Sequence, residues 1–152
     1  MTAKSALTLV STRPDEPPRQ SLRVLVADDD RDGAEVLAAV VREDGHEVVV
    51  ALRGDEALGL CRLFRQDVVI ADLNMPGASG YALARDLRER HGNSAPLLIA
   101  ISGVWTHSSD RSLGEAVGFD HYFIKPYDVK TILSLLEPLR GSSGQVGTPR
   151  AA

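Results

Sequence analysis

The segment LRVLVADDD, residues 22–30, joins a short apolar run to three consecutive carboxylates. After Arg23 every residue up to Ala27 is apolar, which is typical of a strand buried on both faces of a parallel sheet. Asp28 and Asp29 follow directly, so we expect them at the carboxyl end of that strand. Open α/β sheets bind their ligands at this edge. The segment therefore predicts a fold class and the place of a functional site.

Three later apolar runs end in the same way, each in a polar residue. They cover residues 68–71, 97–101 and 122–124 and end at Asp72, Ser102 and Lys125. If all four runs are parallel strands of one sheet, their terminal side chains meet at its carboxyl edge. A cluster of carboxylates with one hydroxyl and one ammonium suits a magnesium ion and a phosphoryl group.

The remaining elements follow from hydrophobic periodicity and from capping residues. Apolar residues at intervals of three and four predict helices between the strands, with Cys61 and Phe64 facing inward in the second of them. That helix is expected to begin at Asp55 and to run to about Arg65. The expected strands are 22–27, 46–52, 67–71, 97–101 and 121–124, and the expected helices begin near Asp30 or Asp32, Asp55, Ser79, Ser108 and Asp128.

Five strands that alternate with five helices predict an α/β fold with a parallel sheet and helices on both faces. Right-handed crossovers leave few arrangements, and the natural one is the flavodoxin-like doubly wound (βα)5 order 2-1-3-4-5. This order puts the first strand beside the third, so Asp28, Asp29 and Asp72 become neighbours.

Composition limits what else the chain contains. With 152 residues it has room for one core, which we place at residues 21–140 between a disordered leader, 1–20, and a flexible tail, 141–152. The net charge of −4 gives no broad basic surface, so we expect no nucleic-acid partner. No apolar run approaches the ~18 residues of a membrane helix, and the single cysteine, Cys61, fits a reducing cytoplasm.

Three carboxylates at one edge repel one another unless a cation lies between them, and magnesium prefers such oxygen ligands. We expect Asp29 and Asp72 as direct ligands, Asp28 as a ligand through water, and the backbone carbonyl of Asn74 as a further ligand. Asp72 is the candidate nucleophile, because a carboxylate can attack phosphorus to form an aspartyl phosphate.

Lys125 and Ser102 are expected to hold two oxygens of the phosphoryl group. A cis bond between Lys125 and Pro126 would redirect the chain and aim the ammonium inward. Each residue alone has a simpler interpretation: acidic residues after a strand often cap helices, most lysines are solvated, and Ser102 precedes a glycine in a possible turn. The functional interpretation depends on the positions together, each at the end of its own strand.

Four motifs contain these strand ends: VLVADDD (24–30), DLNMP (72–76) with Gly80, ISG (101–103) and YFIKP (122–126). With these motifs, residues 21–140 resemble the receiver domain of bacterial two-component response regulators. The resemblance implies that Asp72 accepts a phosphoryl group from a histidine kinase or a histidine phosphotransfer protein, and that Ser102 moves toward it. It also implies that Tyr122 is an aromatic switch that turns inward; the alternative is a fixed, half-buried strand residue.

By this resemblance the chain is a signalling switch rather than an enzyme. We expect a stand-alone receiver that signals through contact with an unknown protein target, with possible homodimerisation through the face of helix 108–117, strand 121–124 and the last helix. The alternatives are a receiver cut from a larger hybrid kinase and a phosphorylation-independent binding module. A haloacid-dehalogenase-type phosphatase also uses an aspartate and magnesium, but this chain has no room for the cap domain of that family.

Overall fold

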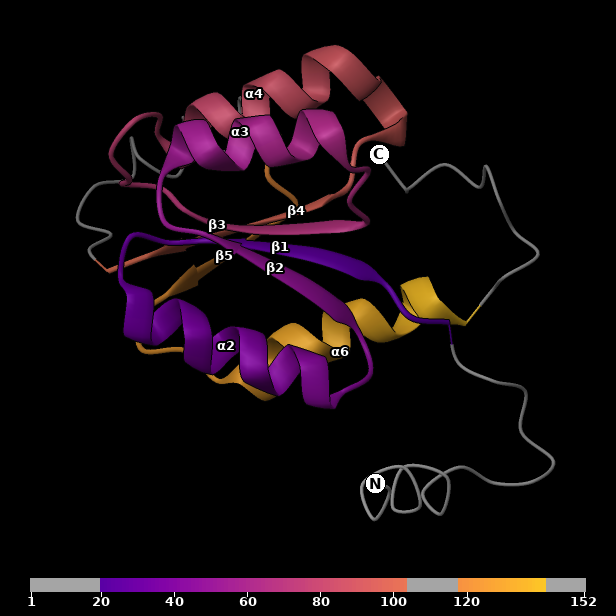
Figure 1. Ribbon diagram of the computed structural model, residues 1–152. Helices are drawn as coiled ribbons and strands as arrows, with labels where there is room; N and C mark the ends of the chain where they lie inside the picture. Colours follow the sequence, from indigo (N-terminus) through magenta and orange to yellow (C-terminus); the bar gives the residue numbers. More distant parts are fainter. Residues whose placement is uncertain (1–19, 104–117, 142–152) are drawn as a thin grey trace, which may run out of the picture.

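The computed structural model describes residues 20–103 and 118–141, in which strands and helices alternate (Figure 1). Most of the expected leader and tail, and the helix expected at 108–117, lie outside the described residues. The elements are β1 (Arg23–Ala27), α2 (Arg31–Glu43), β2 (Glu47–Ala51), α3 (Gly54–Leu63), β3 (Val68–Asp72), α4 (Gly80–His91), the 3-10 helix η1 (Gly92–Ser94), β4 (Leu97–Ser102), β5 (His121–Ile124) and α6 (Val129–Arg140).

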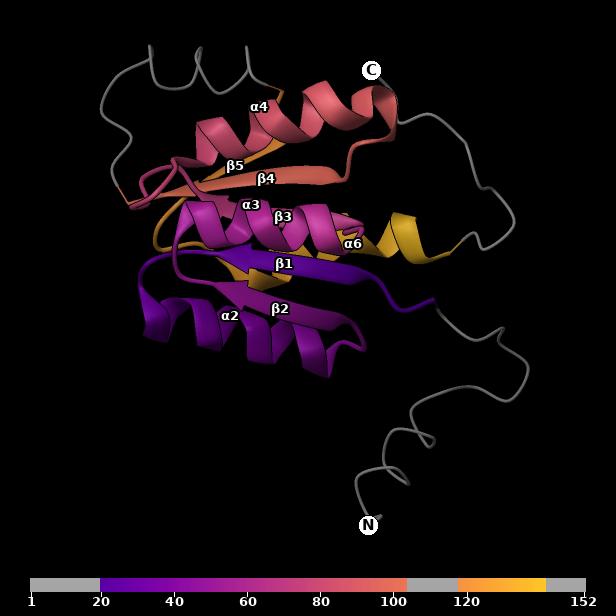
Figure 2. The same ribbon diagram turned by 45° about the horizontal axis from the view of Figure 1, so that its top comes forward.

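The five strands form one parallel sheet in the order β2-β1-β3-β4-β5, which confirms the predicted topology. Figures 1 and 2 show α3 and α4 on one face of the sheet and α2 and α6 on the other. All five residues of β3 and all six of β4 are buried, because both faces of these strands are covered. This double coverage explains why their sequences are continuous apolar runs rather than alternating ones.

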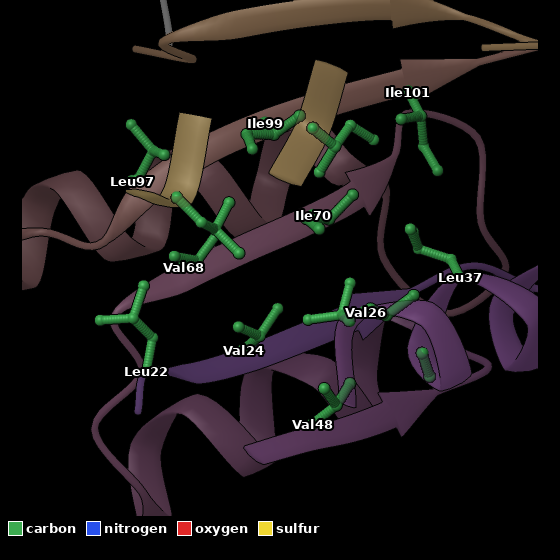
Figure 3. Close-up of a cluster of buried hydrophobic side chains, with 14 of the residues drawn as sticks. Leu22, Val24, Val26, Leu37, Val48, Val68, Ile70, Leu97, Ile99 and Ile101 are labelled. Atoms are coloured by element: carbon green, nitrogen blue, oxygen red, sulfur yellow. The ribbon is translucent and has the colours of Figure 1, made fainter. Parts of the chain in front are cut away.

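Alternate residues of each strand divide between two cores. Val24 and Val26 of β1 lie in one core with Leu37 of α2 (Figure 3). Ile132 and Leu136 of α6 are fully buried in the same core. Leu25 packs on the opposite face, in a second core that it forms with side chains of α3 and α4. The two cores hold the sheet as a rigid middle layer, so the ends of the strands have fixed positions relative to one another.

Two helix caps confirm the sequence interpretation. The Ser79 side chain accepts a hydrogen bond from the Ala82 N–H at the start of α4, and Asp128 accepts one from Lys130 at the start of α6. Asp30 occupies the N-cap position of α2, although its side chain makes no capping hydrogen bond.

The expected limits of α3 were wrong at both ends. The helix begins at Gly54 with Arg53 at the N-cap, and the backbone N–H of Leu52 is bonded by the Glu56 carboxylate at 2.9 Å. At its other end Phe64 already has extended dihedral angles and is 54% exposed, rather than facing inward. The helical periodicity stops before Phe64, so its spacing from Cys61 does not place it in the core.

The two ends of the described fold meet. The N–H of Gln20 donates to the carbonyl of Arg140 at 3.2 Å, beside the buried side chain of His46. Arg140 also donates to the backbone carbonyl of Asp44 at 2.9 Å. These contacts tie the entry to β1 to the end of α6. Among the described residues, no helix is both long enough and apolar enough to cross a membrane.

Candidate functional site at the carboxyl edge of the sheet

The register of the sheet brings the expected site residues to one edge. Asp72 of β3 lies opposite Ile101 of β4, so Ser102 extends one residue further along the neighbouring strand. The backbone N–H of Lys125 donates to the carbonyl of Ser102 at 2.8 Å, which fixes the residue after β5 beside the end of β4. Asp28 follows β1 on the other side of β3.

Three carboxylates converge at this edge. Side-chain oxygens of Asp28, Asp29 and Asp72 lie within 4.8 Å of one another. Asp28 and Asp72 are buried, with exposed fractions of 2% and 6%, whereas Asp29 is exposed. This donor set of hard oxygens, open to solvent on one side, fits a divalent cation such as magnesium.

Backbone N–H groups orient the two buried carboxylates. The N–H of Asp30 donates to Asp28 Oδ1 at 3.0 Å, and the N–H of Asn74 donates to Asp72 Oδ1 at 2.9 Å. In each case the donor is two residues beyond the acceptor, so the chain turns around its own carboxylate as it leaves the strand. The second oxygen of each group remains available to a cation.

Lys125 supplies that cation in this structure. Its Nζ contacts Asp28 Oδ2 at 2.9 Å and Asp72 Oδ2 at 3.0 Å. Burial disfavours the charged lysine, but the hydrogen bonds and charges of the two carboxylates outweigh burial and raise its pKa above the usual value. Lys125 is therefore a permanent ammonium that bridges two strand ends.

Burial raises the pKa of Asp72. The Asn74 N–H and the Lys125 ammonium act in the opposite direction, while the neighbouring charge of Asp28 adds to the increase. Burial thus disfavours the ionised form of Asp72, and a further positive charge nearby would stabilise that form.

The other expected site residues lie around this centre. Ser102 is buried, with 1% exposure, at the end of β4. Tyr122 is half-buried at the second core and packs edge-on against Phe119, with ring centroids 5.9 Å apart. The Lys125–Pro126 peptide bond is cis.

The sequence model of the response regulator receiver domain matches residues 24–137. The chain belongs to the response regulator receiver family. Receiver domains are signalling domains of two-component systems in which phosphorylation of an aspartate is characteristic, and they bind magnesium at an acidic pocket.

Individual relatives of the chain are also described as response regulators. The DNA-binding response regulator MtrA of Mycobacterium tuberculosis is 37% identical over 112 residues, which cover 74% of this chain and 47% of MtrA. The receiver domain of Francisella response regulator 1452 superposes with a TM-score of 0.70 at 30% identity, covering 78% of this chain and 96% of that one. The chain spans about half the length of the curated relatives it matches.

A third comparison is with a structure of a phosphorylated protein. A response regulator from Burkholderia pseudomallei, solved with a phosphorylated aspartic acid, a calcium ion and citrate, superposes with a TM-score of 0.67 at 26% identity. The match covers 75% of this chain and 65% of that chain.

Two features of this receiver were not found from the sequence. Tyr127 lies close enough to the site that burial and the charge of Asp28 raise its pKa, although its only signal is its position two residues after Lys125. A groove of about 390 Å³ adjoins the site, and among its lining residues are Val36, Lys125, Pro126 and Tyr127. The groove lies between α2 and the start of α6, which are distant in sequence.

Proposed function

We propose that this receiver accepts a phosphoryl group on Asp72 from a histidine kinase or a histidine phosphotransfer protein in the cytoplasm. The observation that supports it is the contact of one ammonium, Lys125, with both Asp28 and Asp72 at the carboxyl edge. Asp28, Asp29 and Asp72, with the backbone carbonyl of Asn74, would hold magnesium. The bound ion would offset negative charge between the carboxylates and the incoming phosphoryl group.

The residues of the chain would act mainly through positioning. An oxygen of Asp72 attacks phosphorus as the bond from phosphorus to the donor's histidine nitrogen breaks, and the donor imidazole departs. The Asn74 N–H holds Asp72 Oδ1, so the carboxylate keeps one orientation as it reacts. Lys125 pairs with one phosphoryl oxygen and the Ser102 hydroxyl donates to another.

The phosphorylated state would differ by local charge. A phosphoryl group adds close to two negative charges beside Asp72, which favours the conformation that brings Ser102 and Lys125 nearest. We propose that Tyr122 then repacks inward. The resulting change of surface around β5 and α6 would be read by a protein target or by a second copy of the chain.

We propose that this receiver passes on its signal through contact with a protein and not with a nucleic acid. The net charge of −4 disfavours binding to a phosphate backbone. The description of MtrA as DNA-binding belongs to that protein, of which the present chain covers 47%.

The experiment is incubation with acetyl phosphate, with and without magnesium, followed by intact-mass measurement beside Asp72→Asn. We expect a magnesium-dependent gain of one phosphoryl group in the unaltered protein and none in the variant. The side chain of asparagine has nearly the same shape, so the fold is kept while the nucleophile is lost. Full phosphorylation of Asp72→Asn would refute Asp72 as the acceptor.

A further inference from the structure

The loop that joins β3 to α4, residues 73–79, begins at a fixed point. The N–H of Leu73 donates to the carbonyl of Ile101 at 3.0 Å, and the N–H of Gly80 donates to the carbonyl of Leu73 at 3.1 Å. The loop therefore leaves the sheet in a defined direction. Asn74, the expected carbonyl ligand, is its second residue.

The far end of the same loop rests on the first residue of α3. The N–H of Gly54 donates to the carbonyl of Pro76 at 2.9 Å. A Cβ added to Gly54 would lie 1.7 Å from the carbonyl oxygen of Ala78, whereas real Cβ contacts stay above about 3.0 Å. Helix and loop are thus in backbone contact, which residue 54 allows only because it has no side chain.

The loop, and not the helix, would have to move if a side chain were present at position 54. Ala57 and Cys61 hold α3 in the second core, with exposed fractions of 0% and 6%. In the loop, Pro76 and Gly77 are exposed and Ala78 is partly exposed, while Met75 packs against this core only as a partly buried side chain. Clearing the contact requires a shift of roughly 1.3 Å in the loop carbonyl.

A second glycine, in the loop, also lies close to the start of α3. Gly77 has a φ of +87°, and a Cβ there would lie 2.3 Å from Asp55 Oδ1. Asp55 is itself bonded by Arg53 Nε at 3.0 Å. The loop therefore approaches the start of α3 at two points, backbone to backbone at Gly54 and against the Asp55 side chain at Gly77.

We propose that Gly54 is a positioning residue: the start of α3 sets the loop after Asp72 so that the carbonyl of Asn74 faces the magnesium site. The inference rests on the proposed function and identifies an element that the metal site depends on without touching it. A side chain at position 54 moves the loop and withdraws that ligand, because ligand geometry is set by the groups behind it.

The matched pair of variants is Gly54→Ala and Gly59→Ala. Both put a methyl group on α3, but an added Cβ at Gly59 meets no atom within 4 Å. We expect the magnesium dissociation constant, measured by calorimetric titration on folded protein, to rise about tenfold or more in Gly54→Ala and to stay unchanged in Gly59→Ala. Saturating magnesium should restore the rate of phosphorylation by acetyl phosphate in Gly54→Ala, which a general loss of structure would not allow.

Gly77→Ala is the second variant, because its site is exposed and it strains the loop without entering the core. It should also weaken magnesium binding, and it decides the question if Gly54→Ala does not fold. Magnesium affinities equal to that of Gly59→Ala in the folded variants would overturn the inference. If the unaltered protein binds magnesium but takes no phosphate from acetyl phosphate or a protein donor, the proposed function fails, while the comparison of affinities still stands.

Discussion

A lysine held between two aspartates explains how three carboxylates coexist at one edge before any metal arrives. Lys125 Nζ lies 2.9 Å from Asp28 and 3.0 Å from Asp72, and its side chain is 29% exposed. Partial burial strengthens the attraction relative to a surface ion pair. In the proposed function the same ammonium would pair with a phosphoryl oxygen, so one residue would serve both the resting and the phosphorylated states.

Lys125→Met tests this role. Without the ammonium, Asp28 and Asp72 repel each other, and we expect the metal-free protein to lose about 1–3 kcal/mol of unfolding free energy. Magnesium should restore more stability to the variant than it adds to the unaltered protein, because the ion replaces the missing charge. Thermal unfolding with and without magnesium measures both effects. An equal response to magnesium in the two proteins would contradict the assignment.

The sequence could place these residues at one edge but could not say which of them touch. The ends of apolar runs give positions along a strand, and parallel topology then makes Asp28, Asp72, Ser102 and Lys125 neighbours. The pairing of Lys125 with Asp28 depends on side-chain directions and on the turn after β5. Those features follow from the packed structure and have no periodic signal in the sequence.

At the scale of elements, α2 contributes more than core packing. Its inner face is buried through Leu37 and Val41, while Val36 is 62% exposed at the groove that adjoins the site. A protein donor that reaches Asp72 would lie beside this groove, because Asp28 and Lys125 line it together with Val36. A small donor such as acetyl phosphate needs no such surface.

Val36→Asp separates these two donors. We expect transfer from a phosphorylated histidine protein that is active on the unaltered receiver to slow by about tenfold or more, because the variant puts a charge into an apolar contact. Phosphorylation by acetyl phosphate should stay within about twofold. Leu63→Asp is the control, since Leu63 is 75% exposed on α3, across the sheet from α2 (Figure 1). Equal slowing by both variants would show that the groove beside Val36 is not where the protein donor makes contact.

Sequence patterns predicted some ends of the helices correctly and others wrongly. Ser79 and Asp128 were identified as caps because a short polar side chain just before an apolar stripe is typical of a helix N-cap. For the start of α3 the sequence analysis named Asp55, whereas the N–H of Leu52, before the helix, donates to the Glu56 carboxylate. The backbone contact of Gly54 with the loop 73–79 is tertiary, so no local pattern could reveal it.

At the scale of the whole molecule, a buried histidine links three parts of the fold. His46 Nδ1 accepts a hydrogen bond from the N–H of Leu22 at 3.2 Å, and its Nε2 lies 3.4 Å from both Asp44 Oδ2 and Arg140 Nη1. Burial and the charge of Arg140 lower the pKa of His46, although Asp44 and Glu137 act in the opposite direction. The folded protein therefore favours the neutral ring.

This predicts a fall in stability on mild acidification. The unfolded chain binds a proton at His46 below about pH 6.5, before the folded protein does, so unfolding free energy declines as the pH falls toward the lowered folded pKa. Protonation also removes the acceptor used by Leu22. Urea unfolding between about pH 7.5 and pH 5.5 should show a shallower decline in His46→Gln than in the unaltered protein, together with a loss of about 1 kcal/mol at the higher pH. Parallel pH profiles would exclude His46 as the source.

The hydrogen bond between Gln20 and Arg140 has a consequence for protein architecture. The chain therefore enters and leaves the folded unit at one point, where its two ends are joined by this hydrogen bond. It can be inserted between two other modules, or joined end to end and reopened in a surface turn, without a linker crossing the molecule. A receiver built in this way can be moved between proteins, since its two ends lie together and its fold does not need a fixed route of the surrounding polypeptide.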